Sequence, residues 1–202
     1  MANLTMKVLQ EQINELRNKV AILEATNKVR KIPVGLGIGD TFEIAGINWK
    51  ILDITEKGYM CLADKLEDSM KFDERSSDWE GSQLREYLNT EFFEKISDEI
   101  GEENIITFNR DLTSLDGQTE YGECEDMVSL LTIDEYRKYR KLIPNTNFYW
   151  WLISPWSTPC NDWNRSVAVV SPAGYVVNRD CNNHYGVRPF CIFSSLIFES
   201  EE

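Results

Sequence analysis

The sequence predicts an α+β domain that follows an N-terminal coiled-coil helix. Over the first thirty residues, apolar side chains recur with the heptad spacing of a coiled coil. From Thr41 onward the apolar spacing changes to two, which is typical of strands. Strands and short helices then follow one another in a mixed order, which indicates the α+β class. The predicted units are a coiled coil (1–30), a linker (31–40), a globular ligand-binding domain (41–198) and an acidic tail (199–202).

The charge of the chain excludes several classes of partner. Its 202 residues include 21 Lys and Arg against 34 Asp and Glu, which gives a net charge of −13. Because nucleic-acid affinity comes from Lys and Arg, we expect no nucleic-acid partner. No apolar run approaches the roughly 20 residues of a membrane helix, so we expect no membrane insertion. The first residues also lack the apolar segment of a secretory signal peptide.

The heptad pattern predicts that the N-terminal helix binds another copy of the chain. The residues between the apolar positions are nearly all polar, so the apolar stripe is too narrow to be buried within one helix. Such a short segment leaves the number of copies open between a dimer and a trimer. The alternative is an amphipathic helix packed on its own domain. The predicted oligomerisation residues are Met6, Leu9, Ile13, Leu16, Val20, Leu23 and Asn27.

The first half of the domain begins with strands and continues with a helix. The alternation from Phe42 to Leu52 predicts two short strands around Ala45-Gly46, and residues 59–63 predict a third strand. A helix begins at Ser82, and Asn89-Thr90 is a candidate interruption.

The middle of the domain is expected to be loop-rich over residues 101–122, with a strand at 127–131. Thr132 and Glu135 form a capping box, which predicts a short helix to about Lys141. Residues 148–153 predict an aromatic strand. Trp150 and Trp151 would point to opposite faces of this strand, so at most one of them is expected to be wholly buried.

A hairpin and a last strand complete the domain. Residues 167–170 and 175–177 flank the turn Ser171-Pro172-Ala173-Gly174, which predicts the hairpin. Residues 187–193 predict the last strand, and Pro189 suggests that this strand lies at a sheet edge or contains a bulge.

Two polar clusters flank the hairpin, and both are expected at its open end. Ordinary loops are one interpretation, because Asn, Asp and Ser satisfy local backbone groups. Aromatic residues and Arg lie among them, however, and this composition is typical of binding surfaces. The predicted ligand-binding residues are Trp156, Ser157, Thr158, Asn161, Asp162, Trp163, Asn164, Arg165, Asn178, Arg179, Asp180, Asn182, Asn183, His184 and Tyr185.

Other candidate sites are weaker, and we predict no catalytic residue, metal or cofactor. The acidic run at 120–126 could bind a hard cation, but such runs are usually solvated. Acidic neighbours should raise the pKa of Cys124. His184 is the only histidine, which excludes a multi-histidine metal centre. It could act as a base, but no nucleophile or orienting acid is identifiable, so a contact role is favoured. Arg188 is expected to pair with a carboxylate. Five cysteines, an odd number with no CxxC pair, argue against a disulfide framework and against a Cys-rich zinc site.

Five short motifs in order resemble a known family. They are Trp49-Lys50-Ile51-Leu52-Asp53, Trp79 with residues 82–89, residues 126–132 with Glu135-Tyr136, residues 150–155, and Gly186-Val187-Arg188-Pro189. This order resembles a family of uncharacterised bacterial and phage domains with a C-type-lectin-like fold, over about residues 40–193. That fold is related to formylglycine-generating enzymes and to retroelement-diversified variable proteins of the phage tropism determinant type.

The resemblance implies a binding surface on a fixed scaffold. In the variable proteins the diversified residues lie late in the fold, which here corresponds to about residues 156–185. The sequence lacks the motif of a calcium lectin, because Ile143-Pro144-Asn145 has no carboxylate. Cys181 and Cys191 are ten residues apart without a supporting pattern, so formylglycine-type chemistry is not carried over.

These observations predict a non-enzymatic binding protein in which an oligomer displays lectin-like domains. The implied setting is a phage or prophage tail or fibre, with synthesis in the bacterial cytoplasm, and the implied ligand is a protein or glycan receptor on a cell surface. One rival is a structural virion or assembly subunit. Another is an enzyme of the formylglycine type, which would need a reactive thiol at Cys181 or Cys191.

Overall fold

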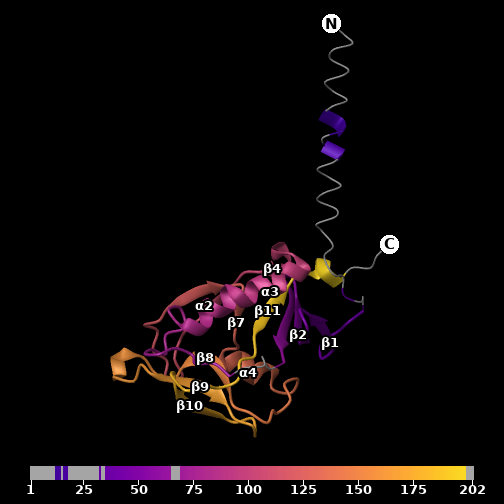
Figure 1. The fold of residues 1–202 in the computed structure, drawn as a ribbon. Helices are drawn as coiled ribbons and strands as arrows, with labels where there is room; N and C mark the ends of the chain where they lie inside the picture. Colours follow the sequence, from indigo (N-terminus) through magenta and orange to yellow (C-terminus); the bar gives the residue numbers. More distant parts are fainter. Residues whose placement is uncertain (1–11, 15, 18–31, 33–34, 65–68, 199–202) are drawn as a thin grey trace, which may run out of the picture.

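The computed structural model describes residues 12–14, 16–17, 32, 35–64 and 69–198 (Figure 1). Residues 12–14 and 16–17 are helical, and the side chains of Ile13 and Leu16 are 42% and 62% exposed. The remaining predicted oligomerisation residues and the acidic tail lie outside the described residues. Those oligomerisation residues are Met6, Leu9, Val20, Leu23 and Asn27.

The main sheet is antiparallel and contains the first and last strands of the domain. Its strands are β1 (Thr41–Ile44), β2 (Ile47–Thr55), β3 (Gly58–Ala63), β11 (Phe190–Phe193) and β4 (Ile105–Ile106) in spatial order, with β7 (Val128–Ser129) also paired to β11. Ala45 and Gly46 join β1 to β2 with positive φ angles of 54° and 72°. Two positive φ angles suit the tight turn of a hairpin, so the predicted hairpin here is confirmed.

A second sheet carries the predicted hairpin. It contains β8 (Trp150–Pro155), β9 (Ser166–Val170) and β10 (Val176–Asp180), in the order β10-β9-β8. A separate ribbon pairs β5 (Phe108–Asp111) with β6 (Glu123–Asp126). Gly186 forms an isolated parallel bridge to Trp150, so the chain beyond the hairpin returns along β8.

The helices begin where the sequence predicts. They are α2 (Gln83–Asn89), α3 (Glu91–Ile100) and α4 (Ile133–Tyr139), with short 3-10 turns η1 (Glu102–Asn104), η2 (Pro159–Asn161) and η3 (Ser195–Phe198). The side chain of Ser82 accepts a hydrogen bond from the Arg85 amide at 3.1 Å, and Thr132 forms the predicted capping box. Figure 1 shows α2 and α3 on one side of β7 and β11, with β9 and β10 on the other side. These elements confirm a mixed α+β domain.

The second sheet lies between two apolar clusters. Side chains of Trp151 and Val169 belong to the cluster that contains Trp49, whereas Trp150 and Ala168 belong to the other cluster. Trp150 and Trp151 are therefore 1% and 0% exposed. The prediction that only one could be wholly buried was wrong, because both faces of this antiparallel sheet are covered.

One further expectation from the sequence was wrong, and another holds only in part. The last strand, β11, is central rather than at an edge, since β3 and β7 both pair with it. Pro189 lies just before this strand and still contributes its carbonyl, which accepts the Ala63 amide at 2.8 Å. The acidic run at 120–126 is exposed at Glu120, Glu123 and Glu125, as expected, but its last residue, Asp126, is buried at the end of β6.

Asp126 connects the helical layer to the β5–β6 ribbon. Its Oδ2 accepts a hydrogen bond from Trp79 Nε1 at 2.7 Å, and its Oδ1 accepts one from Arg85 Nε at 2.6 Å. The Arg85 guanidinium also donates to the Glu125 carbonyl at 2.9 Å. A buried carboxylate is stable only when its oxygens are satisfied, so these donors make Asp126 a fixed point of the fold.

We expect Asp126→Asn to lower the free energy of unfolding by about 2–4 kcal/mol, because it removes one partner of a largely buried ion pair. Urea denaturation measures the change. The matched control is Asp134→Asn in the exposed pair with Arg137, where we expect a change below about 1 kcal/mol. Equal losses in the two variants would contradict a special role for Asp126.

Candidate functional site

The structure brings the two predicted polar clusters together at one end of the β9–β10 hairpin. Ser166, the first residue of β9, is the register partner of Asp180, the last residue of β10. The Cys181 amide extends this pairing with a hydrogen bond of 2.7 Å to the Arg165 carbonyl. Residues 156–165 and 181–185 therefore leave the hairpin side by side.

An ion pair holds these two segments to each other. Arg165 Nη2 lies 2.9 Å from Asp180 Oδ1, and Arg165 Nε lies 3.2 Å from Oδ2. The two parallel contacts fix the guanidinium in one orientation. The hydrogen bonds from Arg165 lower the pKa of Asp180, and those to Asp180 raise the pKa of Arg165.

A third segment, residues 70–77, joins the surface and was not predicted from the sequence. The amides of Phe72 and Asp73 donate to the Cys181 carbonyl at 3.0 and 3.1 Å. The Ser77 amide donates to the Asn164 carbonyl at 2.8 Å. Asp73 also accepts hydrogen bonds from two amides within its own turn. The Asp and Ser residues here signal a turn, but nothing in their spacing indicates its distant partner.

A fourth segment, residues 114–120, anchors the loop after β8. Asp116 Oδ2 accepts hydrogen bonds from Ser157 Oγ at 2.6 Å and Asn161 Nδ2 at 2.9 Å. Hydrogen bonds from Ser114 and Ser157 lower the pKa of Asp116. Ser157 and Thr158 are buried, so these two predicted contact residues are removed from the surface that a ligand could reach. They support the loop instead.

We call the surface built by residues 70–77, 114–120, 156–165 and 181–185 the loop cluster. Its most exposed aromatic side chain is Trp163, at 52%. A pocket of about 180 Å³ opens beside it. The pocket is lined by Asp162, Trp163, Asn164, Arg165 and Ser166. Asp162 adopts a left-handed conformation with φ of 55°, which closes η2 and begins the pocket wall.

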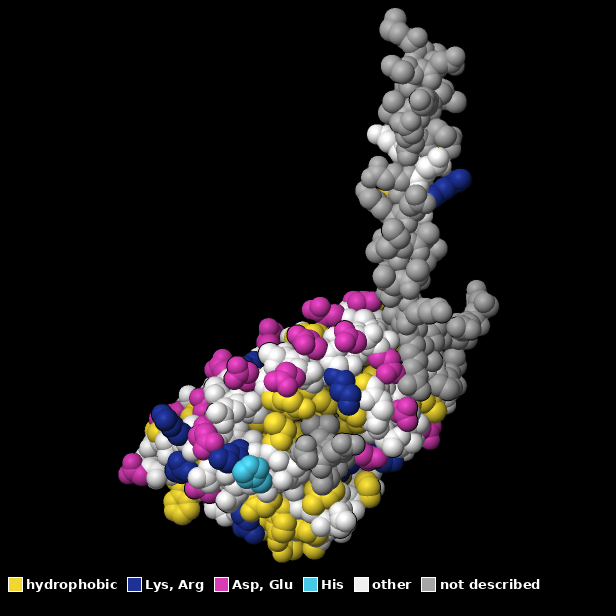
Figure 2. Space-filling model, in the orientation of Figure 1, with side chains coloured by type: hydrophobic (Ala, Val, Ile, Leu, Met, Phe, Trp, Pro, Cys, Tyr) yellow, Lys and Arg dark blue, Asp and Glu magenta, His cyan; other side chains and the backbone are white. Residues whose placement is uncertain are grey.

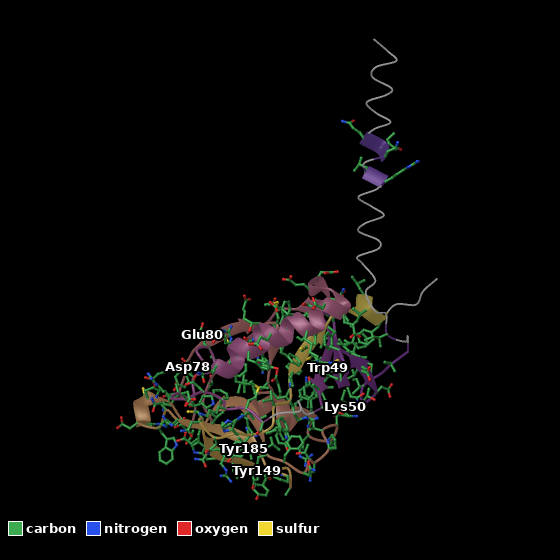
Figure 3. All side chains as sticks on the ribbon, in the orientation of Figure 1. Trp49, Lys50, Asp78, Glu80, Tyr149 and Tyr185 are labelled. Carbon is green, nitrogen blue, oxygen red and sulfur yellow. The ribbon has the colours of Figure 1, made fainter. Side chains whose placement is uncertain are left out.

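An aromatic group borders the loop cluster on the face of β10. The rings of Tyr149 and Tyr185 lie 5.7 Å apart, and Tyr185 packs edge-on against the buried Trp151 ring at 5.0 Å (Figure 3). The Arg179 guanidinium lies over the Tyr149 ring, with 5.3 Å from Cζ to the ring centre. Within the described residues no carboxylate lies within 4.0 Å of Arg179.

The exposed polar residues complete this end of the domain. Asn182, Asn183 and His184 are exposed, whereas Trp156 and Asn178 are half-buried. Figure 2 shows the cyan His184 side chain beside Lys or Arg side chains, with Asp and Glu side chains both close to them and over the rest of this face. The loop cluster carries charges of both signs, with Lys71, Arg75 and Arg165 against Asp73, Glu74, Asp116, Glu120 and Asp162.

The cysteine thiols are poorly suited to nucleophilic chemistry. Burial raises the pKa of Cys181 to about 11 and raises that of Cys191 well above its usual range. Burial, followed by the charge of Asp126, raises the pKa of Cys124 to about 11, in the predicted direction. The exposed Cys160 has its pKa raised by its hydrogen bond with Glu120. Because the thiolate is the reactive form, none of these groups is activated.

The described part of the chain contains no group of three His, Cys, Asp or Glu side chains placed to hold a metal ion. Its helices are also too short or too polar to cross a membrane. What the loop cluster offers chemically is directional hydrogen bonding from amides and guanidinium groups, together with stacking on Trp163.

Residues 56–195 match the family described as a domain of unknown function, DUF6273. The chain belongs to this family. The DUF6273 region includes every segment of the loop cluster and the β9–β10 hairpin, whereas both apolar clusters also contain residues before it, such as Trp49 and Leu52. No curated protein and no solved structure matches the chain.

We expect Asp180→Asn to loosen the loop cluster without unfolding the DUF6273 domain, because it breaks the ion pair between two exposed segments. Hydrogen exchange should become faster at the Ser77 and Cys181 amides and stay unchanged at the Ala63 amide in the main sheet.

Lowering the pH should loosen the same two contacts, because it protonates Asp180. Because the pKa of Asp180 is lowered, the contact is intact above about pH 4 and is lost as the pH falls through that lowered value. Uniform acceleration at all three amides would contradict this interpretation.

Proposed function

We propose that this DUF6273 chain is a non-enzymatic ligand-binding protein whose contact surface is the loop cluster. The observation that carries the proposal is the exposure of Trp163 on a loop that is itself held rigidly. Hydrogen bonds to Asp116 and Asn164 fix that loop from two sides. Exposed aromatic side chains on fixed loops are typical anchors of binding surfaces, because little conformational freedom is lost on binding.

The proposed architecture is C-type-lectin-like. Short strands in two sheets, few helices and long connections support this assignment. The two ends of the domain also meet, since the Ile32 amide donates to the Ile197 carbonyl at 2.7 Å. The resemblance in the sequence places the diversified residues of related variable proteins at the loop cluster. On this proposal the setting is a phage or prophage tail, and the ligand is a protein or glycan on a cell surface.

The position of the domain ends suits multivalent display. Ile32 contacts η3, and Figure 1 shows η3 and η2 at opposite ends of the domain. Copies joined through the N-terminal helix would therefore present their loop clusters away from the junction. Joining weak sites in this way raises the overall affinity through effective concentration.

We expect Trp163→Ala to reduce binding of the full chain to its target cells at least about tenfold, which corresponds to about 1.4 kcal/mol per site. Flow cytometry of fluorescent chain on a panel of bacterial strains measures the binding. Tyr175→Ala is the matched control, because Tyr175 is 57% exposed but lies at the turn end of the hairpin. Unchanged circular dichroism shows that the variant is folded. Binding that survives Trp163→Ala, or that no strain shows, would overturn the proposal.

We expect the double change Ile13→Glu and Leu16→Glu to convert an oligomer into a monomer, because it places charges at the predicted a and d positions. Sedimentation equilibrium of the full chain measures the mass. The matched control is Asn14→Glu with Asn18→Glu, which adds the same charge at positions outside the predicted seam. A monomeric parent chain, or equal dissociation by both double variants, would contradict the coiled coil.

A further inference from the structure

Strand β10 has one edge without a partner strand among the described residues. It pairs with β9 alone, and all five of its residues are only half-buried. The β9–β10 register is regular over its whole length, without a bulge. Natural edge strands are usually protected by bulges, proline or close cover, because their open backbone groups accept another strand. Strand β10 itself contains no proline.

The register shows which backbone groups point outward. The Cys181 amide donates to the Arg165 carbonyl, and the Ser171 amide donates to the Tyr175 carbonyl. The pairs 165/181 and 171/175 are therefore hydrogen-bonded pairs of the antiparallel ladder. In an antiparallel pair such positions alternate. Residues 177 and 179 therefore direct their backbone groups toward β9, whereas Val176, Asn178 and Asp180 direct theirs to the open edge.

One backbone group at the open edge already has a hydrogen-bond partner that an added strand could replace. The Asn178 carbonyl accepts a hydrogen bond from Arg179 Nη1 at 2.9 Å. The Asp180 carbonyl accepts the Asn183 amide at 3.0 Å, which closes the edge at that end. The groups open to a partner strand are thus the amide and carbonyl of Val176 and the amides of Asn178 and Asp180, and the Asn178 carbonyl becomes open when Arg179 turns away.

The side chains beside this edge indicate the chemistry of the partner. Val177 and Arg179 lie on the same strand face, next to Tyr149. Asp180 forms an ion pair with Arg165, whereas Arg179 has no carboxylate within 4.0 Å in the described part of the chain. A strand that pairs here would place one side chain opposite Arg179 and another opposite Val177. An acidic and an apolar side chain satisfy these two positions.

We infer that the open edge of β10 binds an extended polypeptide segment as an added strand, with an acidic side chain of that segment at Arg179. Repeated backbone donors and acceptors are matched by another strand and not by a glycan, so the inference names the partner class as polypeptide. It rests on the proposed binding function, because Asn178, Arg179 and Asp180 border the loop cluster. A second copy is a less suitable occupant, since each copy carries a net charge of −13 and places a second Arg179 near the first.

The first test is hydrogen exchange in the full chain, measured by NMR at a concentration below that at which its mass increases. We expect the Val177, Arg179 and Cys181 amides to be protected and the Val176, Asn178 and Asp180 amides to exchange quickly. Protection of the outward amides in the free chain would overturn the inference, because the edge would then be covered. Protection that appears only as the concentration rises would overturn it in favour of a second copy.

The second test is an NMR titration with the capped heptapeptide TVTETVT, whose central acidic residue and flanking valines share one strand face. We expect shifts and new protection at the Val176 and Asn178 amides. The same peptide with a central lysine should bind about tenfold more weakly, because it loses a charge-assisted contact. A version N-methylated at its third and fifth residues should not bind. Equal binding of the N-methylated peptide would overturn strand pairing.

Variants of the chain complete the design. Arg179→Glu should reverse the preference between the acidic and the lysine peptide. Asn178→Pro removes an outward amide but no bond to β9, so it should abolish binding in a folded domain, whereas Asn178→Ala keeps the amide and should bind. If Trp163→Ala abolishes cell binding while Asn178→Pro leaves it unchanged and no peptide binds, the proposed function stands and the strand inference falls. If the peptide binds as expected but no cell does, the inference stands and the proposed function falls.

Discussion

The buried carboxylate of Asp126 is the contact on which both the fold and the loop cluster depend. It satisfies Trp79 and Arg85 at once, and so it fixes the start of α2 against β6. Trp79 lies two residues after Ser77, the last residue of the 70–77 segment of the loop cluster. Ser77 Oγ also lies 3.3 Å from the Tyr121 hydroxyl, close to the same ribbon. A single buried acid therefore holds the helical layer and one wall of the candidate site in register.

Two buried arginines likewise connect separate elements around the second apolar cluster. Arg110 makes a bidentate contact with Glu135, which is also the capping-box residue of α4. Arg188 is 2% exposed, donates to the Ala63 carbonyl and lies 5.1 Å from the centre of the Trp150 ring. Burial lowers the pKa of Arg188 to about 10, so the side chain still carries its charge at neutral pH. Its nearest carboxylate in the described residues, Asp64, is 4.0 Å away, which is a looser pairing than the sequence predicted.

Local patterns in the sequence were sufficient to predict the elements that depend on nearby residues. The turn at Ala45-Gly46, the cap at Ser82 and the box at Thr132 are each determined within four residues, and each was predicted correctly. Features that depend on contacts between distant parts of the chain could not be predicted from the sequence. Asp126 could not be distinguished from its solvated acidic neighbours, because burial depends on Trp79, 47 residues earlier. The two faces of β8 were misjudged for the same reason, since alternation along one strand cannot show how many layers cover it.

The candidate site shows the same division. The hairpin pattern was enough to place two polar segments at one end, because register partners meet wherever a hairpin forms. It did not show that Ser157 and Thr158 turn inward, since their partner, the 114–120 segment, is far away in sequence. The result is a surface in which some polar residues are fully engaged in support while a few are left open. Arg179 is notable in this respect: the chain has an excess of 13 acidic residues, yet none in the described structure reaches this guanidinium. The Arg179 guanidinium instead donates to the Asn178 carbonyl and lies over the Tyr149 ring, so the carboxylate of an added strand would pair with it without displacing an ion pair of the described residues.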